Sequence, residues 1–336
     1  MTVLDRRSFI ALPFVLAACS GGPRTLDLVG RTMGTTYTVK LVDHSGRLSK
    51  ADVEVAVSAA LEVTNTTLSN WDAESDVSQF NAAQTTDPVS VTRPLYDVAR
   101  AAEDIRQASE GRFDVALGPL IETWGFGARG ANSAAPSEAQ IAAAMAQTGQ
   151  GGAMTFGAGT LQKAHAGQGL FLSAIGKGYG VDRVADALRA LGAEDFMVEI
   201  GGDLYAQGRN EDGQPWRIGI ETPDDAVAGL QGIAGLKGHG MATSGDYRNY
   251  FEQGGQRYSH ILDAQTGRPV THQTASATVV TADAMRADAW ATAMLVLGSS
   301  KGSAIAEANG LAVFFVDREG DRFVTRATSA FAAVAA

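Results

Sequence analysis

The order of helix and strand patterns constrains the fold of this chain more than any other feature of its sequence. Apolar residues recur at helical spacing in five segments, namely residues 51–67, 94–109, 138–147, 178–191 and 284–297. β-Branched and aromatic runs predict strands at residues 31–41, 196–200 and 274–281, and a closing hairpin at residues 311–316 and 321–325. The two patterns do not alternate strictly, and no internal repeat is evident. We therefore expect a mixed α/β fold, rich in antiparallel sheet and flanked by helices.

The composition is typical of a chain that buries a large core. Of 336 residues, 45% are hydrophobic and 19% are charged, which excludes a wholly disordered chain. The 27 Lys and Arg residues against 37 Asp and Glu leave a formal charge of −10. Because nucleic-acid binding needs a basic footprint and the sequence has no such Lys/Arg cluster, we expect no nucleic-acid partner.

The first 19 residues have the pattern of an export signal that ends in a lipobox. Arg6-Arg7-Ser8-Phe9-Ile10 resembles a twin-arginine signal, and a short apolar run leads to Leu16-Ala17-Ala18-Cys19. A lone cysteine is often a small buried hydrophobe, but Cys19 stands where bacterial lipoproteins are lipidated. We expect residues 1–19 to be this signal, residues 20–26 a linker and residues 27–330 one globular domain. The protein would then be extracytoplasmic, on the periplasmic face, and anchored to the membrane through Cys19.

A glycine–lysine pair stands where a strong amphipathic helix is predicted to begin. The segment reads Ala174-Ile175-Gly176-Lys177-Gly178. A helix start presents free N–H groups and the positive end of the helix dipole, which suit an anion such as phosphate. The segment lacks the spacing of a Walker A loop. Because glycine-rich helix entries are also common without a ligand, the motif alone leaves both interpretations open.

Three further side chains are candidates for chemistry. Asp288 and Thr292 lie four residues apart and so share one face of a predicted helix. Their hard oxygens suit Mg²⁺, although a Thr bonded back to a carbonyl would explain the pair equally well. His260 is either a general base or a satisfied core histidine. The other four histidines share no ligand spacing, which argues against a zinc site.

The order of motifs along the chain resembles the ApbE family, the Mg-dependent FAD:protein FMN transferases. The resemblance covers residues 27–325 and rests on nine motifs. They are Met33-Gly34-Thr35-Thr36-Tyr37, Ser69-Asn70-Trp71 with Ser75-Asp76-Val77-Ser78-Gln79-Phe80-Asn81, Gly111-Arg112-Phe113-Asp114 to Gly118-Pro119-Leu120, Trp124-Gly125-Phe126-Gly127, Gly176-Lys177-Gly178-Tyr179, Gly201-Gly202-Asp203, Thr243-Ser244-Gly245, Ser259-His260-Ile261 and Asp288-Ala289-Trp290-Ala291-Thr292.

The resemblance implies an enzyme that splits FAD and attaches FMN, through its phosphate, to a Ser or Thr of an exported flavoprotein subunit of a redox complex, releasing AMP. It implies Mg²⁺ held by the Ala174 carbonyl, Asp288 and Thr292, and a general base that is either His260 or Asp288. By motif position, the FAD-binding residues would be Met33, Trp71, Phe113, Asp114, Lys177 and Ile261.

The sequence departs from the family pattern in three places. Phe171 replaces an Asp associated with nucleotide contact, Trp71 stands where Tyr is usual, and Asp263-Ala264 replaces Asp-Pro. The change at Phe171 keeps two other functions open, an FAD hydrolase that forms FMN and AMP, and a non-catalytic flavin-binding lipoprotein. The export signal also fits the NosX branch of the family, whose members serve an exported metalloenzyme.

Overall fold

The computed structural model describes residues 24–127, 134–148, 154–224, 229–247 and 249–335. The predicted export signal and Cys19 lie outside the described residues, as does the first part of the predicted linker. Its last part, residues 24–26, already belongs to the first strand, so the folded domain begins earlier than predicted. In the part of the chain that the structure describes, no helix is both long and apolar enough to span a membrane.

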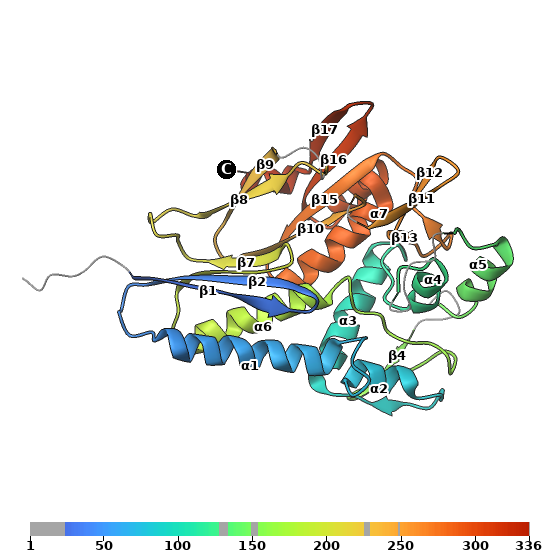
Figure 1. Ribbon diagram of the computed structural model, residues 1–336, viewed down its shortest axis with the longest axis horizontal. Coiled ribbons are helices and arrows are strands. Elements are labelled where there is room, and N and C mark those ends of the chain that lie inside the picture. Colours follow the sequence, from blue (N-terminus) through green and yellow to red (C-terminus); the bar gives the residue numbers. More distant parts are fainter. Residues whose placement is uncertain (1–23, 128–133, 149–153, 225–228, 248, 336) are drawn as a thin grey trace, which may run out of the picture.

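An eight-stranded sheet, antiparallel throughout, forms the centre of the molecule (Figure 1). Its spatial order is β1 (Arg24–Thr32), β2 (Thr35–Asp43), β6 (Asp195–Ile200), β7 (Asp203–Gln207), β10 (His239–Gly245), β15 (Thr274–Thr281), β16 (Ala312–Glu319) and β17 (Arg322–Ala327). The remaining strands form small separate sheets. Three are antiparallel pairs: β8 (Trp216–Glu221) with β9 (Leu230–Leu236), β11 (Tyr250–Gln253) with β12 (Gln256–Ser259), and β13 (Leu262–Asp263) with β14 (Arg268–Pro269). The fourth is three-stranded, with β5 (Thr160–Gln162) between β3 (Val89–Ser90) and β4 (Thr155–Phe156). The expected mixed α/β fold with antiparallel sheet is confirmed.

Helices α1 (Lys50–Leu68), α6 (Gly176–Ala190) and α7 (Ala284–Ala308) cover one face of the sheet (Figure 1). The other helices are α2 (Asp76–Ala82), α3 (Arg93–Ala108), α4 (Gly118–Thr123) and α5 (Glu138–Met145). Of these, α3 packs on α7, and α4 and α5 pack on each other. Successive side chains of a strand point to opposite faces of the sheet, so each central strand contributes to two hydrophobic cores. Val313 and Phe315 of β16 pack toward the helices. Phe314 and Val316 pack toward the other face, which β8, β9 and the 3₁₀ helix Ser329–Ala333 cover.

The predicted helices agree with the structure, but the first predicted strand is wrong. Residues 31–41 are not one strand: β1 and β2 form a hairpin that turns at Met33 and Gly34, with φ of 48° and 73°. A methionine with positive φ is uncommon, and β-branched residues flank the turn, so Gly34 alone was too weak a turn signal. Residues 284–297 are helical as predicted, and Gly298 follows this run directly. Its φ of 70° interrupts α7, and a second helical run follows directly to Ala308.

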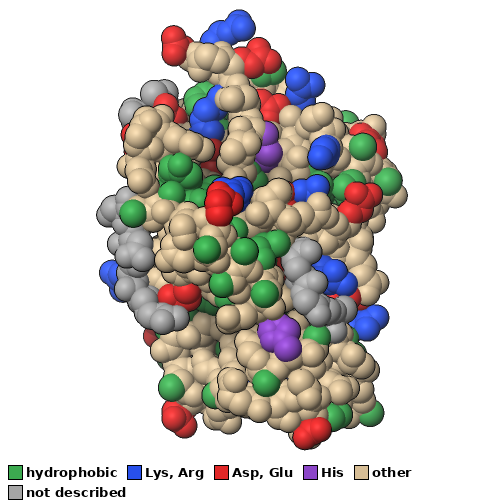
Figure 2. Space-filling view, turned by 90° about the vertical axis from the view of Figure 1, so that its right-hand side faces the viewer, with side chains coloured by type: hydrophobic (Ala, Val, Ile, Leu, Met, Phe, Trp, Pro, Cys, Tyr) green, Lys and Arg blue, Asp and Glu red, His purple; other side chains and the backbone are tan. Residues whose placement is uncertain are grey.

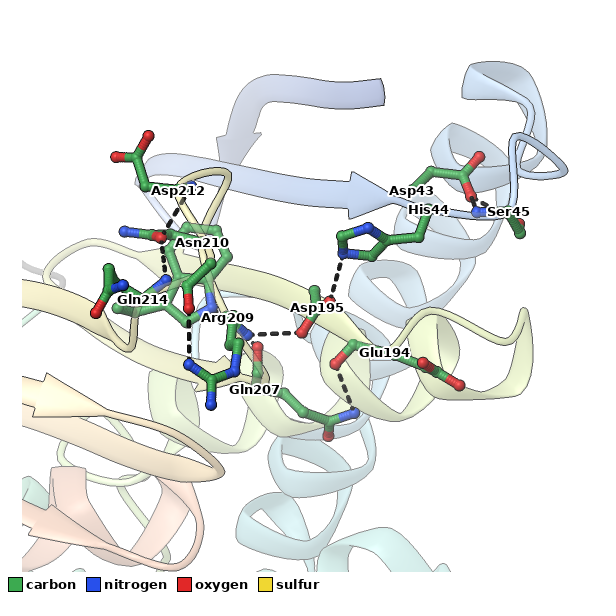
Figure 3. A network of polar contacts seen from close by, with 12 residues as sticks. Asp43, His44, Ser45, Glu194, Asp195, Gln207, Arg209, Asn210, Asp212 and Gln214 are labelled. Atoms are coloured by element: carbon green, nitrogen blue, oxygen red, sulfur yellow. Dashed lines mark hydrogen bonds and ion pairs between the residues drawn. The ribbon is translucent and has the colours of Figure 1, made fainter. Parts of the chain in front are cut away.

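A polar network holds the loops at the end of the β1–β2 hairpin that lies away from Met33 (Figure 3). The buried Asp43 carboxylate accepts hydrogen bonds from the N–H groups of Ser45, Gly46 and Leu48. His44 Nε2 lies 2.8 Å from Asp195 Oδ2, and the Arg209 N–H donates to Asp195 Oδ1 at 2.6 Å. These contacts join the end of β2 to the loops that follow α6 and β7, and so fix the hairpin from its far end.

Candidate active site

Two cavities meet at the N-terminus of α6. The larger has a volume of about 360 Å³ and the smaller about 150 Å³. Ser173 and Lys177 line both, so the two spaces adjoin at the glycine–lysine segment. Together they fall in the size range of small-molecule sites, and their two-part shape suits a ligand with a ring system at each end and charge in the middle.

The glycines at the start of α6 let two helices approach closely. A Cβ added to Gly178 would lie 2.2 Å from the carbonyl oxygen of Ala284, and one added to Gly180 would lie 2.5 Å from Met33 Cε. Gly178 therefore allows α6 to pack against the start of α7. The first residue before α6, Ile175, provides no side-chain cap. The start of α6 therefore packs closely against α7, and its free N–H groups are within reach of a side chain of α7, Asp288.

Lys177 lies between two buried carboxylates. Its Nζ is 2.7 Å from Asp203 Oδ2 and 3.5 Å from Asp288 Oδ1, and both aspartates are almost fully buried. Burial by itself would lower the pKa of Lys177, but the two carboxylates raise it above its ordinary value. Burial and the nearby Asp288 carboxylate raise the pKa of Asp203, against the opposing effect of Lys177. The lysine is thus a permanent positive charge at the junction of the cavities.

Asp288 and Thr292 face the same cavity, as their spacing predicts. Both line the larger space together with Ala174. Asp288 Oδ2 accepts a hydrogen bond from the Gly178 N–H at 3.1 Å, and Thr292 Oγ1 lies 3.1 Å from Ser244 Oγ. The two side chains therefore share one cavity, in which Asp288 contacts the entry of α6 and Thr292 contacts Ser244 on β10. A carboxylate, a hydroxyl and a backbone carbonyl form a set of hard oxygen donors, and this donor set fits Mg²⁺.

The described residues contain no group of three or more His, Cys, Asp or Glu side chains that could hold a metal ion. A metal at this position would thus rely on the hydroxyl, the backbone carbonyl, water and ligand oxygens in addition to Asp288. Mg²⁺ is commonly held in this way, by one or two carboxylates with waters and substrate phosphates. The absence of a carboxylate cluster is accordingly consistent with the predicted donor set.

His260 is oriented by a backbone carbonyl. Its Nδ1 lies 3.0 Å from the Asn249 carbonyl oxygen, which can only accept, so Nδ1 carries the proton and Nε2 is left as the basic nitrogen. Burial lowers the pKa of His260 below its ordinary value, with the Asn249 hydrogen bond acting in the opposite sense. The imidazole lines the larger cavity with Asp288 and Thr292, and it is neutral near pH 7.

The remaining predicted FAD-binding residues line the same two spaces. Met33 and Trp71 border the smaller cavity, and Phe113, Asp114 and Ile261 border the larger. Trp71 is 64% exposed, which leaves its indole face available for stacking. Burial raises the pKa of Asp114, although the Ala116 N–H donates to it at 2.7 Å.

Phe171, the residue that departs from the family pattern, lies in the wall of the larger cavity. Its ring meets the Trp71 ring edge-on with centroids 5.8 Å apart. Two of the three departures therefore touch each other. An aromatic pair stands where the family pattern has a carboxylate near a tyrosine.

Three residues of the site were not assigned a role from sequence. Asp203 follows Gly201-Gly202 at the start of β7 and pairs with Lys177, and Ser244 on β10 contacts Thr292. Asp182 accepts hydrogen bonds from the N–H groups of Ala284 and Met285, both at 2.9 Å. It thereby caps α7 from α6. The signal for Asp203 was visible, because a Gly-Gly-Asp run after a buried strand is unusual, whereas the contact of Asp182 depends on the tertiary structure.

Fold and site together define the class of protein. It is a mixed α/β protein with a two-part cavity, and at the junction of the two parts lie a lysine between two carboxylates and a set of oxygen donors that fits a metal ion. The ApbE family model matches residues 33–315. An FAD:protein FMN transferase of Vibrio cholerae is 38% identical over 322 residues, which cover 96% of each chain. The chain belongs to the ApbE family.

Solved structures agree with this assignment. The flavin transferase ApbE from Vibrio cholerae superposes with a TM-score of 0.86 at 37% identity, covering 93% of this chain and 99% of that one. The apo form of the flavinyl transferase ApbE from Pseudomonas stutzeri has a TM-score of 0.85 at 43% identity and covers 93% and 97%. The family that the motif order indicated is thus confirmed by sequence and by fold.

Proposed function

We propose that this chain is an FAD:protein FMN transferase. In the reaction, the hydroxyl oxygen of a Ser or Thr on an acceptor protein forms a bond to the FMN-side phosphorus of FAD. The pyrophosphate P–O bond breaks, AMP leaves, and the hydroxyl proton passes to a base. The observation that carries the proposal is the junction of two cavities at Lys177, with Asp288 in contact with it and Thr292 in the wall of the larger cavity.

Asp288, Thr292 and the Ala174 carbonyl are the residues that would hold Mg²⁺. When bound, the ion would neutralise charge on the pyrophosphate and align it. The chain itself adds Lys177, whose ammonium is held in place by Asp203 at 2.7 Å. Because phosphoryl transfer depends mainly on positioning and charge stabilisation, a fixed cation at the junction of the cavities is what the reaction requires.

His260 is the better candidate for the general base. Asp288 lies in the cavity wall with Ala174 and Thr292, and its carboxylate is engaged by the Gly178 N–H and the Lys177 ammonium. A metal ion bound there would take up its remaining lone pairs and leave none to a proton. His260 lines the cavity with its Nδ1 proton engaged by Asn249, which leaves Nε2 as the nitrogen that can accept a proton. Between the two alternatives that the sequence left open, the contacts therefore favour His260 as base and Asp288 as metal ligand.

Trp71 and Phe171 would bind aromatic rings of FAD by stacking. The exposed indole and the edge-on phenyl ring offer apolar faces in adjoining walls. Phe171 cannot accept a hydrogen bond from a nucleobase, so affinity at that end would come from ring contacts rather than from a carboxylate. This interpretation keeps the transferase function and assigns a role to both departures.

The acceptor and the location follow from the N-terminal pattern. An export signal that ends at Cys19 would place the domain on the periplasmic face of a bacterial membrane, held by lipid on that cysteine. The acceptor would then be an exported flavoprotein subunit of a redox complex in the same compartment, with its hydroxyl in an exposed loop.

Mass spectrometry tests the proposal directly. The full-length chain is incubated with FAD, Mg²⁺ and a candidate exported subunit, and the subunit is searched for covalent FMN on Ser or Thr. Transfer predicts one FMN attached and one AMP released per acceptor. AMP release at the same rate without an acceptor would instead identify an FAD hydrolase. Bound flavin without AMP under either condition would identify a flavin carrier.

A further inference from the structure

A second, cationic pocket adjoins the candidate active site. It has a volume of about 500 Å³ and shares two lining residues, Arg112 and Val296, with the larger of the two active-site cavities. Its walls come from β12, from the β13–β14 hairpin with the segment after it, and from α7 around the break at Gly298. None of the residues assigned above to FAD or Mg²⁺ lines this pocket.

The pocket concentrates positive charge in a chain that is strongly acidic overall. Four cations line it, Arg112, Arg257, Arg268 and Lys301, against one carboxylate, Asp263. The protein as a whole has a formal charge of −10. A local excess of cations beside the site cannot therefore be a consequence of the composition. On the side of the molecule that Figure 2 shows, Lys and Arg side chains are interspersed with Asp and Glu side chains from top to bottom.

Two of these cations have no carboxylate partner among the described residues. Arg112 pairs with Asp263 at 2.5 Å, and Arg268 pairs with Glu138. Arg257 instead stacks on Tyr250, with its Cζ 3.5 Å from the ring centroid, and its Nη2 donates to the Tyr247 carbonyl at 3.3 Å. The exposed Lys301 on α7 forms no ion pair in the part of the chain that the structure describes. Arg257 and Lys301 are thus available to an anionic partner.

We infer that this pocket docks an acidic segment of the acceptor protein, next to the hydroxyl that receives FMN. The inference rests on the proposed function and adds the chemistry of the protein substrate to it. An acceptor hydroxyl must reach His260, and Asp263 in the wall of the pocket is three residues further along the chain, at most about 11 Å away. An extended peptide advances about 3.3 Å per residue. An Asp or Glu about three to five residues from the hydroxyl therefore reaches the pocket whose wall contains Asp263, Arg257 and Lys301.

Charge reversal at Lys301 tests the inference. Lys301 is exposed and lies outside the FAD and metal positions, so Lys301→Glu should fold and bind FAD as the wild type does. The control is Lys237→Glu, an equal change of charge at an exposed position between β9 and β10. It lies at the end of β10 that is remote from Ser244. FAD affinity is followed by flavin fluorescence, and FMN attachment is measured against acceptor concentration.

At 0.1 M salt we expect Lys301→Glu to raise the KM for the acceptor about five- to tenfold, with kcat and FAD affinity unchanged. The difference should shrink to less than about twofold at 1 M salt, because the Debye length falls from about 10 Å to about 3 Å. Lys237→Glu should leave the KM unchanged. An acceptor whose acidic residues near the hydroxyl are replaced by Lys should lose affinity for the wild type and regain it with Lys301→Glu.

The outcomes separate this inference from the proposed function. If the wild type attaches FMN but its KM is the same in Lys301→Glu and insensitive to acidic residues of the acceptor, the docking pocket is wrong and the transferase function stands. A rise in KM that is equal for Lys301→Glu and Lys237→Glu also overturns the pocket, because it would reflect net charge alone. If the wild type attaches no FMN to any exported subunit, the proposed function fails, and this inference with it.

Discussion

Replacement of His260 by Gln isolates the role of the base. The Gln amide keeps a polar group of similar length in the cavity wall, but it cannot take up a proton, and the contact of Nδ1 with the Asn249 carbonyl is lost with the ring. The cavity walls and the Lys177 cluster are untouched. A positioned general base contributes about 10²–10⁴ to a rate, which is about 3–5 kcal/mol of barrier. We expect kcat for FMN attachment to fall by that factor, while the affinity for FAD stays the same.

The pH dependence gives a second measurement on the same pair of proteins. A base acts in its neutral form, so the rate should rise with pH through the pKa of His260 and then level off. Because burial lowers this pKa below the ordinary 6.5 of histidine, the plateau should be reached at a lower pH than for a solvent-exposed histidine. The acid limb should be absent in His260→Gln.

The assay is single-turnover transfer from FAD to a purified acceptor between pH 5 and pH 8, with AMP release as the second readout. Two results would refute the assignment. One is a variant that retains a tenth or more of the wild-type rate, and the other is a variant with an unchanged acid limb. Either would move the base to another group, and Asp288 would be the next to examine.

Three further predictions concern the metal, the flavin and the support of α7. Asp288→Asn keeps an acceptor for the Gly178 N–H but is a poor Mg²⁺ ligand, so the Mg²⁺ concentration for half-maximal rate should rise at least about tenfold in a titration, and an unchanged value would remove Asp288 from the metal site. Trp71→Ala should weaken FAD binding by about 1–3 kcal/mol in a fluorescence titration if the exposed indole stacks on the ligand, and equal affinity would contradict stacking. Asp182→Ala removes both hydrogen bonds to the start of α7 and should lower the free energy of unfolding by about 2–3 kcal/mol in urea, whereas a loss below about 0.5 kcal/mol would show that the cap is dispensable. Because burial raises the pKa of Asp182 to about 7 in the folded protein, its contribution to stability should be greatest below about pH 4 and be lost as the pH rises to 7, a trend that Asp182→Asn should not show.

Much of the secondary structure could be predicted because it depends on local pattern. The helix at residues 284–297 and its end at Gly298 follow from apolar spacing and from a glycine that takes positive φ. The turn at Met33 could not be predicted, since its positive φ is imposed by the pairing of β1 with β2 and no typical turn residue marks it except Gly34. At this turn, the pairing of the two strands has a larger effect than the strand propensity of the flanking residues.

For the site, spacing predicted one part and tertiary structure supplied the rest. Asp288 and Thr292 share a helix face because they are four residues apart, and this much is a property of any helix. Their proximity to Lys177, and that of Asp203, depends on how α6 and α7 cross and on where β7 begins. The sequence predicts an anion site at the glycines of this helix start, but only the tertiary structure shows that Gly178 also serves packing, because a Cβ there would lie 2.2 Å from the Ala284 carbonyl oxygen.

The sequence by itself determined which segments are helices and strands, which side chains can bear the chemistry, and, through the order of its motifs, the family. These properties depend on residues close together in the chain or on their succession. Only the tertiary structure decided that Lys177 lies between Asp203 and Asp288, that His260 presents Nε2, and that a cationic pocket adjoins the site. The physical reason is that an antiparallel sheet of order β1-β2-β6-β7-β10-β15-β16-β17 brings together residues more than a hundred positions apart, and local patterns carry no record of such distances.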